Sequence, residues 1–133
     1  MTLVTKVADA SLDAASAMYA PQRSGLTAGA AIDALAPCYI KESDGLVYMS
    51  DGTAANEAAS FDGFSPRAYA AGDSNVTLLG IGTKFRYATG LTAGANYYIA
   101  ATAGRLDTAA TTGDAVGIVR AITATVVRVL RDF

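Results

Sequence analysis

The sequence predicts an all-β protein: a compact β-sandwich or barrel of short strands with an extended N-terminal arm. Short apolar runs alternate with glycine-containing turns at intervals of about 8–12 residues, a spacing typical of sandwiches and barrels. Valine, isoleucine and threonine, which favour strands, together number 29, and 13 glycines interrupt the chain too often for long helices. A length of 133 residues is enough for one domain with a modest core.

Residues 1–24 are predicted to form the arm, and residues 25–133 the β domain. The arm begins with a strand-like segment, residues 3–8 (LVTKVA), and continues into an alanine-rich stretch. Apolar residues recur there at helical spacing, which favours a short helix that ends before Pro21. Because so short a helix is marginal alone, we expect the arm to become ordered by packing on its own domain or on a neighbouring subunit. The residues expected to contact a partner are Leu3, Val4, Leu12, Met18, Tyr19 and Arg23.

The β domain is expected to contain a hairpin and several further strands. Residues 38–41 and 46–49 are apolar runs on either side of Asp44-Gly45, a dipeptide that favours a tight turn. The alanine-rich residues 53–60 can form one helical turn within a loop. Further strands are expected at residues 76–79, 84–88, 97–100, 115–122 and 125–130.

The chain contains an internal repeat. The pentapeptide GLTAG occurs at residues 25–29 and again at residues 90–94. Each copy precedes the same order of features: a Tyr-Ile strand, a glycine-containing turn, a return strand and a strand in which glycine precedes an apolar residue. A five-residue match can arise by chance in a chain rich in alanine, glycine and threonine, so the surrounding order is the stronger indication. The sequence predicts two degenerate β repeats, residues 25–80 and 90–131, which share one core because each alone is too small.

The composition disfavours enzyme chemistry. The chain has no histidine, which excludes Ser-His-Asp and Cys-His catalysis and any imidazole metal ligand. Most aspartates lie near glycines, where carboxylates commonly bind the backbone amides of turns, and their spacing does not match a calcium loop. The single cysteine, Cys38, lies in an apolar stretch and is expected to be buried rather than reactive. We therefore predict that the protein is not an enzyme and has no catalytic, cofactor-binding or metal-binding residues.

Charge patterning limits the kinds of partner. The net charge of −2 and the isoelectric point of about 4.8 argue against nucleic acid, and no run of 18 apolar residues predicts a membrane span. Arg120, Arg128 and Arg131 lie near the C-terminal end. Alternation along the last strand places Arg128 on the face opposite Val127 and Val129. We interpret these arginines as the solvated face of an edge strand; the alternative is that they pair with carboxylates of a neighbouring subunit.

The second half of the chain resembles a module of tailed-bacteriophage structural proteins. The resemblance is carried by residues 87–99 (YATGLTAGANYYI), 103–106 (AGRL) and 113–119 (GDAVGIV). These segments are similar to the C-terminal half of small capsid decoration (cement) proteins and to domains of some tail and fibre proteins.

The first half resembles the same decoration proteins. It does so through residues 39–52 (YIKESDGLVYMSDG) and 70–78 (AAGDSNVTL). The chain departs from the pattern at Ala93, where proline is common, and at Pro66, which disfavours a central strand at that point. The resemblance covers about residues 25–130 in all.

The resemblance implies a function in the virion. Proteins of this kind are all-β, commonly homotrimeric, and lie on the outer surface of the phage head after synthesis in the host bacterial cytoplasm. They bind the major capsid protein and stabilise contacts between its copies against the pressure of packaged DNA. No cofactor, nucleic acid or membrane is expected as a partner. The alternatives are a tail or baseplate component, or a small carbohydrate-binding module.

Overall fold

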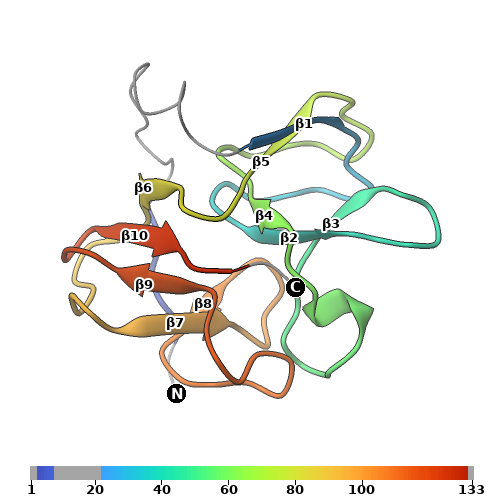
Figure 1. The fold of residues 1–133 in the computed structure, drawn as a ribbon. Helices are drawn as coiled ribbons and strands as arrows, with labels where there is room; N and C mark the ends of the chain where they lie inside the picture. Colours follow the sequence, from blue (N-terminus) through green and yellow to red (C-terminus); the bar gives the residue numbers. More distant parts are fainter. Residues whose placement is uncertain (1–2, 8–21, 132–133) are drawn as a thin grey trace.

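The structure is a computed structural model that describes residues 3–7 and 22–131. In this part of the chain ten β-strands form two five-stranded antiparallel sheets that pack together, and the single helical element is a 3-10 turn, η1 (Glu57–Ala59) (Figure 1). The predicted all-β sandwich of short strands is therefore confirmed. No helix among these residues has the length and apolar character needed to cross a membrane. Sheet 1 consists of β1 (Gln22–Leu26), β2 (Pro37–Ile40), β3 (Val47–Met49), β4 (Gly63–Phe64) and β5 (Val76–Leu79). Sheet 2 consists of β6 (Lys84–Arg86), β7 (Asn96–Ile99), β8 (Leu106–Asp107), β9 (Val119–Ala121) and β10 (Val126–Val129).

Local sequence patterns predicted most of these strands. The run at residues 76–79 is β5, and the two runs around Asp44-Gly45 are the antiparallel pair β2–β3. The helical turn expected within residues 53–60 is η1, where the Asn56 side chain accepts a hydrogen bond from the Ala58 N–H. The strand β1 was not predicted, because its sequence QRSGL is polar and it is held by a distant strand, β5.

Both sheets have the same strand order. Numbered within each sheet along the chain, the strands lie in the order first, fifth, fourth, second, third: β1-β5-β4-β2-β3 in sheet 1 and β6-β10-β9-β7-β8 in sheet 2. In each sheet the second and third strands form a hairpin, and the first strand lies at the edge beside the fifth. The chain thus builds one five-strand plan twice, first from residues 22–79 and then from residues 84–129.

The hairpins of the two sheets match in detail. The loop that joins their strands has six residues in each case, 41–46 in sheet 1 and 100–105 in sheet 2. In both loops the first residue donates its N–H to the carbonyl of the last residue at 2.9 Å. In both, the fifth residue is a glycine in the left-handed region, Gly45 at φ 72° and Gly104 at φ 76°, a conformation that costs a residue with a Cβ more.

An aspartate supports the second strand of each sheet in the same way. The N–H of Ile40 donates to the Asp62 carboxylate at 2.8 Å, and the N–H of Ile99 donates to the Asp114 carboxylate at 2.9 Å. The other oxygen of Asp114 accepts the Gly117 N–H at 2.8 Å. These aspartates bind backbone amides, as predicted for the aspartates near glycines.

The two sheets stack front to back. When they are aligned through their second strands, Phe64 of β4 corresponds to Arg120 of β9, and Leu79 of β5 to Arg128 of β10. Phe64 and Leu79 point into the core between the sheets, whereas Arg120 and Arg128 are exposed. We call this side of the plan the front face. The front face of sheet 1 is covered by sheet 2, and the front face of sheet 2 points outward.

The core between the sheets is centred on Phe64. Its ring centroid lies 5.2 Å from that of Phe61, 5.0 Å from that of Phe85 and 6.2 Å from that of Tyr87. Phe61 and Phe64 belong to the first half of the chain, and Phe85 and Tyr87 to the second. The two halves therefore share one core.

The described start of the chain packs on sheet 2. In residues 3–7, the Val4 N–H donates to the Leu106 carbonyl at 3.0 Å and the Val7 N–H to the Tyr87 carbonyl at 2.7 Å. The Val4 side chain is only 8% exposed and belongs to the shared core. This part of the segment predicted as an arm is thus ordered by its own domain.

We expect Asp114→Ala to lower the free energy of unfolding by about 3 kcal/mol, because it leaves buried amide groups and the Arg131 guanidinium without their acceptor. Asp73→Ala is the matched control, because the Asp73 carboxylate accepts one N–H group, that of Ala70. This substitution should lower the free energy of unfolding by at most about 1 kcal/mol. Urea unfolding of the three proteins checks this. Equal losses in the two variants would contradict the supporting role of Asp114.

Candidate partner-binding surface

The outer faces of the two sheets differ in how they are covered. The outer face of sheet 1 lies under a second apolar cluster, in which Ala28, Ile32 and Tyr69 from the connecting loops pack on strand residues such as Val76 and Leu78. Sheet 1 is therefore buried on both sides. The front face of sheet 2 carries exposed side chains, so this sheet is buried on one side only.

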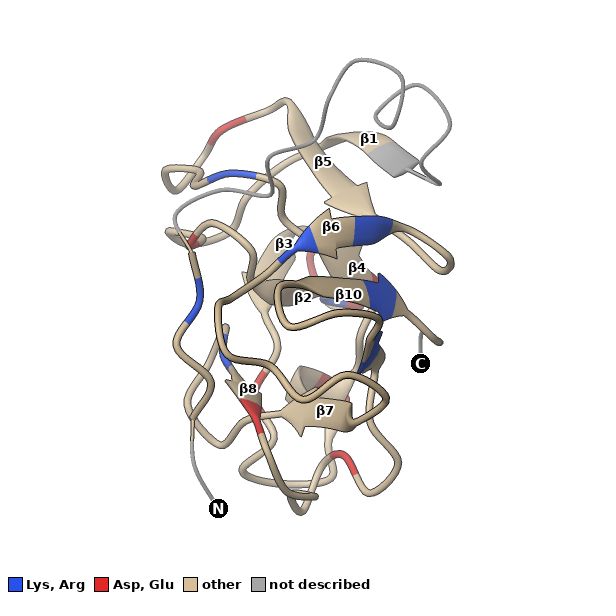
Figure 2. Cartoon of the chain, turned by 90° about the vertical axis from the view of Figure 1, so that its left-hand side faces the viewer, with Lys and Arg blue, Asp and Glu red and all other residues tan. Residues whose placement is uncertain are grey.

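Cations form a row across the front face of sheet 2. Arg128 on β10 lies directly opposite Lys84 on β6 and directly opposite Arg120 on β9. Arg86 lies two residues beyond Lys84, opposite Val126. The four cationic side chains are exposed, and Figure 2 shows the basic positions of β6 and β10 in blue on strands at the front of the view. We call Lys84, Arg86, Arg120 and Arg128 the cationic face.

These cations have no acidic partner within the described chain. Arg120 donates from Nε to the Gly94 carbonyl at 3.3 Å, and no carboxylate of the described residues forms an ion pair with any member of the cationic face. Arg131 differs, because its guanidinium lies 3.2 Å from the buried Asp114 carboxylate. Like charges directly opposite each other across strands repel, so the row is held at an energetic cost.

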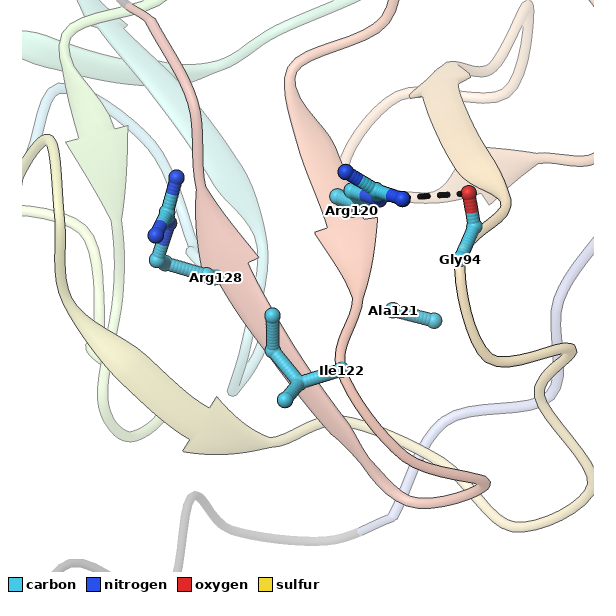
Figure 3. A pocket seen from close by; sticks show the side chains of 5 residues that line it. All are labelled: Gly94, Arg120, Ala121, Ile122 and Arg128. Carbon is cyan, nitrogen blue, oxygen red and sulfur yellow. Dashed lines mark hydrogen bonds between the residues drawn. The ribbon is translucent and has the colours of Figure 1, made fainter.

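A shallow hollow lies within the cationic face. Its volume is about 220 Å³, and it is lined by Gly94, Arg120, Ala121, Ile122 and Arg128. Ile122 also lines the hollow, on the side toward the β9–β10 turn in Figure 3, and this side chain is 43% exposed. The surface therefore combines positive charge with an aliphatic contact, a combination found where proteins bind one another.

The charges of the two halves are opposite. Residues 22–79 contain three basic and seven acidic residues, a net charge of −4. Residues 84–131 contain six basic and two acidic residues, a net charge of +4, and both of these acids, Asp107 and Asp114, are buried. Although the net charge of the whole chain is close to zero, its first half is therefore strongly negative and its second half strongly positive.

The negative charge of the first half is concentrated beside the β2–β3 hairpin. The Glu42 N–H donates to the Glu57 carboxylate. Burial, and then the negative charges of Glu57, Asp44 and Asp51, raise the pKa of the Tyr39 hydroxyl in β2. Glu42, Asp44 and Glu57 are exposed and Asp51 is half-buried. We call Glu42, Asp44, Asp51 and Glu57 the acidic corner.

One interpretation of the arginines is wrong. The strand β10 lies between β6 and β9, so Arg128 does not protect a sheet edge. The alternation itself is confirmed, because Val127 and Val129 are buried and Arg128 is exposed. An outward row of cations centred on the internal strand β10 needs another explanation, and pairing with carboxylates of another molecule is the alternative that the sequence left open.

The structure brings together few of the expected contact residues. Leu3 is 38% exposed, whereas Val4 lies in the chain's own core, so its side chain is not free for a partner in this fold. Arg23 lies in β1 opposite Leu78. Three further expected contacts, Leu12, Met18 and Tyr19, lie outside the described residues.

Sequence analysis missed Lys84 and Arg86 as surface residues. Their signal was present: in Lys84-Phe85-Arg86 two cations flank one apolar residue, as in a strand with one solvated face. What the sequence did not reveal was that this strand lies beside β10, because the two are far apart along the chain.

Burial shifts the pKa of the Cys38, Tyr87 and Lys6 side chains. Cys38 is fully buried, its thiol donates to the Ala36 carbonyl at 3.3 Å, and burial raises its pKa to about 12. Burial likewise raises the pKa of Tyr87 and lowers that of Lys6. The prediction that Cys38 is a buried apolar residue is confirmed.

No protein-family model and no curated protein matches this chain. The surface is therefore interpreted from its own geometry. A sheet face whose cations have no acidic partner among the described residues, with one exposed aliphatic side chain, suits contact with a large anionic surface, whereas small molecules are usually held in deep, mostly apolar pockets.

We expect Arg128→Gln to raise the free energy of unfolding by about 0.5 kcal/mol at low salt, because it removes the central charge of the cationic row. Arg128→Lys keeps the positive charge, so its free energy of unfolding at low salt should not rise. Denaturant unfolding at low salt and at about 1 M salt checks the cause, since the difference should disappear when charges are screened. A loss of stability in Arg128→Gln at low salt would refute repulsion within the row.

Alkaline pH should destabilise the protein through Cys38. The folded thiol keeps its proton up to a pKa of about 12, whereas the unfolded thiol loses it near its usual value of 9.0. Between these values the folded state binds more protons, so the free energy of unfolding falls as pH rises, by up to about 1.4 kcal/mol per pH unit. Cys38→Ala lacks this contribution. Its stability relative to the unmodified chain should rise from pH 8 to pH 11 in urea unfolding; parallel curves would refute the assignment.

Proposed function

We propose that this chain is a decoration protein of a tailed-bacteriophage head, which binds the outer surface of the shell and stabilises contacts between major capsid proteins. The observation that carries the proposal is the open cationic face of sheet 2. A protein that works by presenting surface needs a rigid body with a contact face, and sheet 2 offers one that the rest of the described chain leaves uncovered.

The positions of the phage-like segments support the proposal. In the second half, residues 90–94 lead from β6 toward β7, residues 103–106 close the β7–β8 hairpin, and residues 113–119 lead into β9. In the first half, residues 39–52 contain the matching hairpin β2–β3. The resemblance thus involves the turns and strands from which both sheets are built.

The shared core suits a protein under mechanical load. Phe64 joins the two sheets, and the hydrogen-bonded aspartates Asp62 and Asp114 support one strand in each. A decoration protein must resist the outward pressure on the shell without unfolding, and a core shared by the two halves favours cooperative unfolding over separate unfolding of either half.

The test is the copy number of this chain relative to the major capsid protein, measured by quantitative mass spectrometry of purified particles of the phage that encodes it. We expect many copies in a simple ratio to the shell protein. A handful of copies would instead favour a tail or baseplate component, and absence from particles would refute a structural role. Sugar binding by the isolated protein would favour the carbohydrate-binding alternative.

A further inference from the structure

We propose that the cationic face binds the acidic corner of a second copy of this chain, so that copies associate head to tail. The inference rests on the proposed function, in which the protein acts by presenting contact faces on the shell, and it assigns the cationic face to the contact between neighbouring copies.

The two surfaces are complementary in charge. The cationic face offers four basic side chains without an acidic partner among the described residues, and the acidic corner offers four carboxylates with one neighbouring cation, Lys41. Lys41 itself lies over the Tyr48 ring, 5.2 Å from its centroid. Neutralisation by a second copy would relieve the repulsion in the row of Lys84, Arg128 and Arg120.

The two surfaces cannot meet within one molecule. In Figure 1 the β2–β3 hairpin extends to the right, while β6 and β10 lie at the left. Figure 2 views the molecule from that left-hand side, with β6 and β10 in front. A contact between the cationic face and the acidic corner is therefore a contact between different copies.

The hairpin tip suits the hollow in size. Residues 43–45 (SDG) are exposed, and Asp44 stands there between two small residues. A small protruding tip can enter a hollow of about 220 Å³ whose walls include Arg120 and Arg128. This brings one carboxylate between two guanidinium groups, an arrangement that favours charge-assisted hydrogen bonds.

The front face of sheet 1 is already a contact surface within the molecule, because sheet 2 packs on it. In sheet 1 the equivalent positions are Phe64 and Leu79, and the next five-strand unit covers them. In sheet 2 the same positions are Arg120 and Arg128, and no described element covers them. The replacement of apolar by basic residues changes the kind of surface that fits from an apolar sheet to an acidic one.

Such a contact is heterologous, because each copy contributes a different surface. Copies joined in this way form a closed ring when the rotation closes and a filament when it does not. The ionic character predicts association that weakens as salt rises.

The experiment uses two charge-reversed variants of the full chain. The face variant is Arg120→Glu with Arg128→Glu, and the corner variant is Glu42→Lys with Glu57→Lys. Arg67→Glu is the control, since Arg67 is an exposed cation of the first half, outside both surfaces. Circular dichroism and thermal unfolding verify that each variant is folded, and sedimentation velocity measures association at about 0.05 M and about 0.5 M salt.

We expect the unmodified chain and the Arg67→Glu control to associate at low salt and to dissociate at high salt. Each reversed variant alone should associate at least about tenfold more weakly, because like charges then face each other. A mixture of the two variants should associate again, since the intact face of the corner variant meets the intact corner of the face variant. An isologous contact between two cationic faces, or between two acidic corners, would instead be weakened in only one of the two variants.

The outcomes separate this inference from the proposed function. Monomers at both salt concentrations, or a mixture that fails to associate although the unmodified chain does, would refute the head-to-tail contact. Neither result changes the copy number on phage particles, on which the proposed function depends. Conversely, absence from particles together with restored association in the mixture would refute the decoration role and support the contact.

Discussion

The burial of Phe64 between the two sheets is the contact on which the rest of the structure depends. Its ring touches Phe61 from its own half of the chain and Phe85 and Tyr87 from the other half. Units of about fifty residues are only marginally stable alone, and here one core cluster draws on both halves, so each sheet is stabilised by the other. Because the front of sheet 1 must be covered by the back of sheet 2, the front of sheet 2 is left outside. The exposure of the cationic face is a consequence of how the core is built.

The residues on that exposed face are not those that would stabilise the sheet most. Threonine or valine at position 128 would pack on a strand without repulsion, whereas Arg128 lies between Lys84 and Arg120. The same chain pairs Arg131 with the buried Asp114. Residues that are locally unfavourable for stability are concentrated at functional sites in proteins. Here the unfavourable residues are the like-charged side chains of one surface, the cationic face. This contrast supports binding as the reason for the row.

The sequence predicted what depends on neighbouring residues. The Asp44-Gly45 turn, the run at 76–79 and the alternation around Arg128 all follow from local backbone and side-chain preferences, and the structure has them. It did not predict β1, whose polar sequence becomes a strand only through β5. Nor did it predict that Lys84 lies beside Arg128, because a crossed strand order is fixed by packing between distant segments. The candidate surface consists of such non-local neighbours, so only its individual arginines were visible in the sequence.

The direction of stacking determines what kind of self-contact is possible. Two sheets related by a two-fold axis would expose the same face at both ends, and like surfaces would then meet in an isologous contact. In this chain the sheets point the same way, as the equivalence of Phe64 with Arg120 and of Leu79 with Arg128 requires. The two ends of the stack therefore differ in structure, and the two halves differ by eight units of net charge. Unlike ends of opposite charge favour a head-to-tail contact over an isologous one, so the repeated plan and the separated charges both support the proposed form of association.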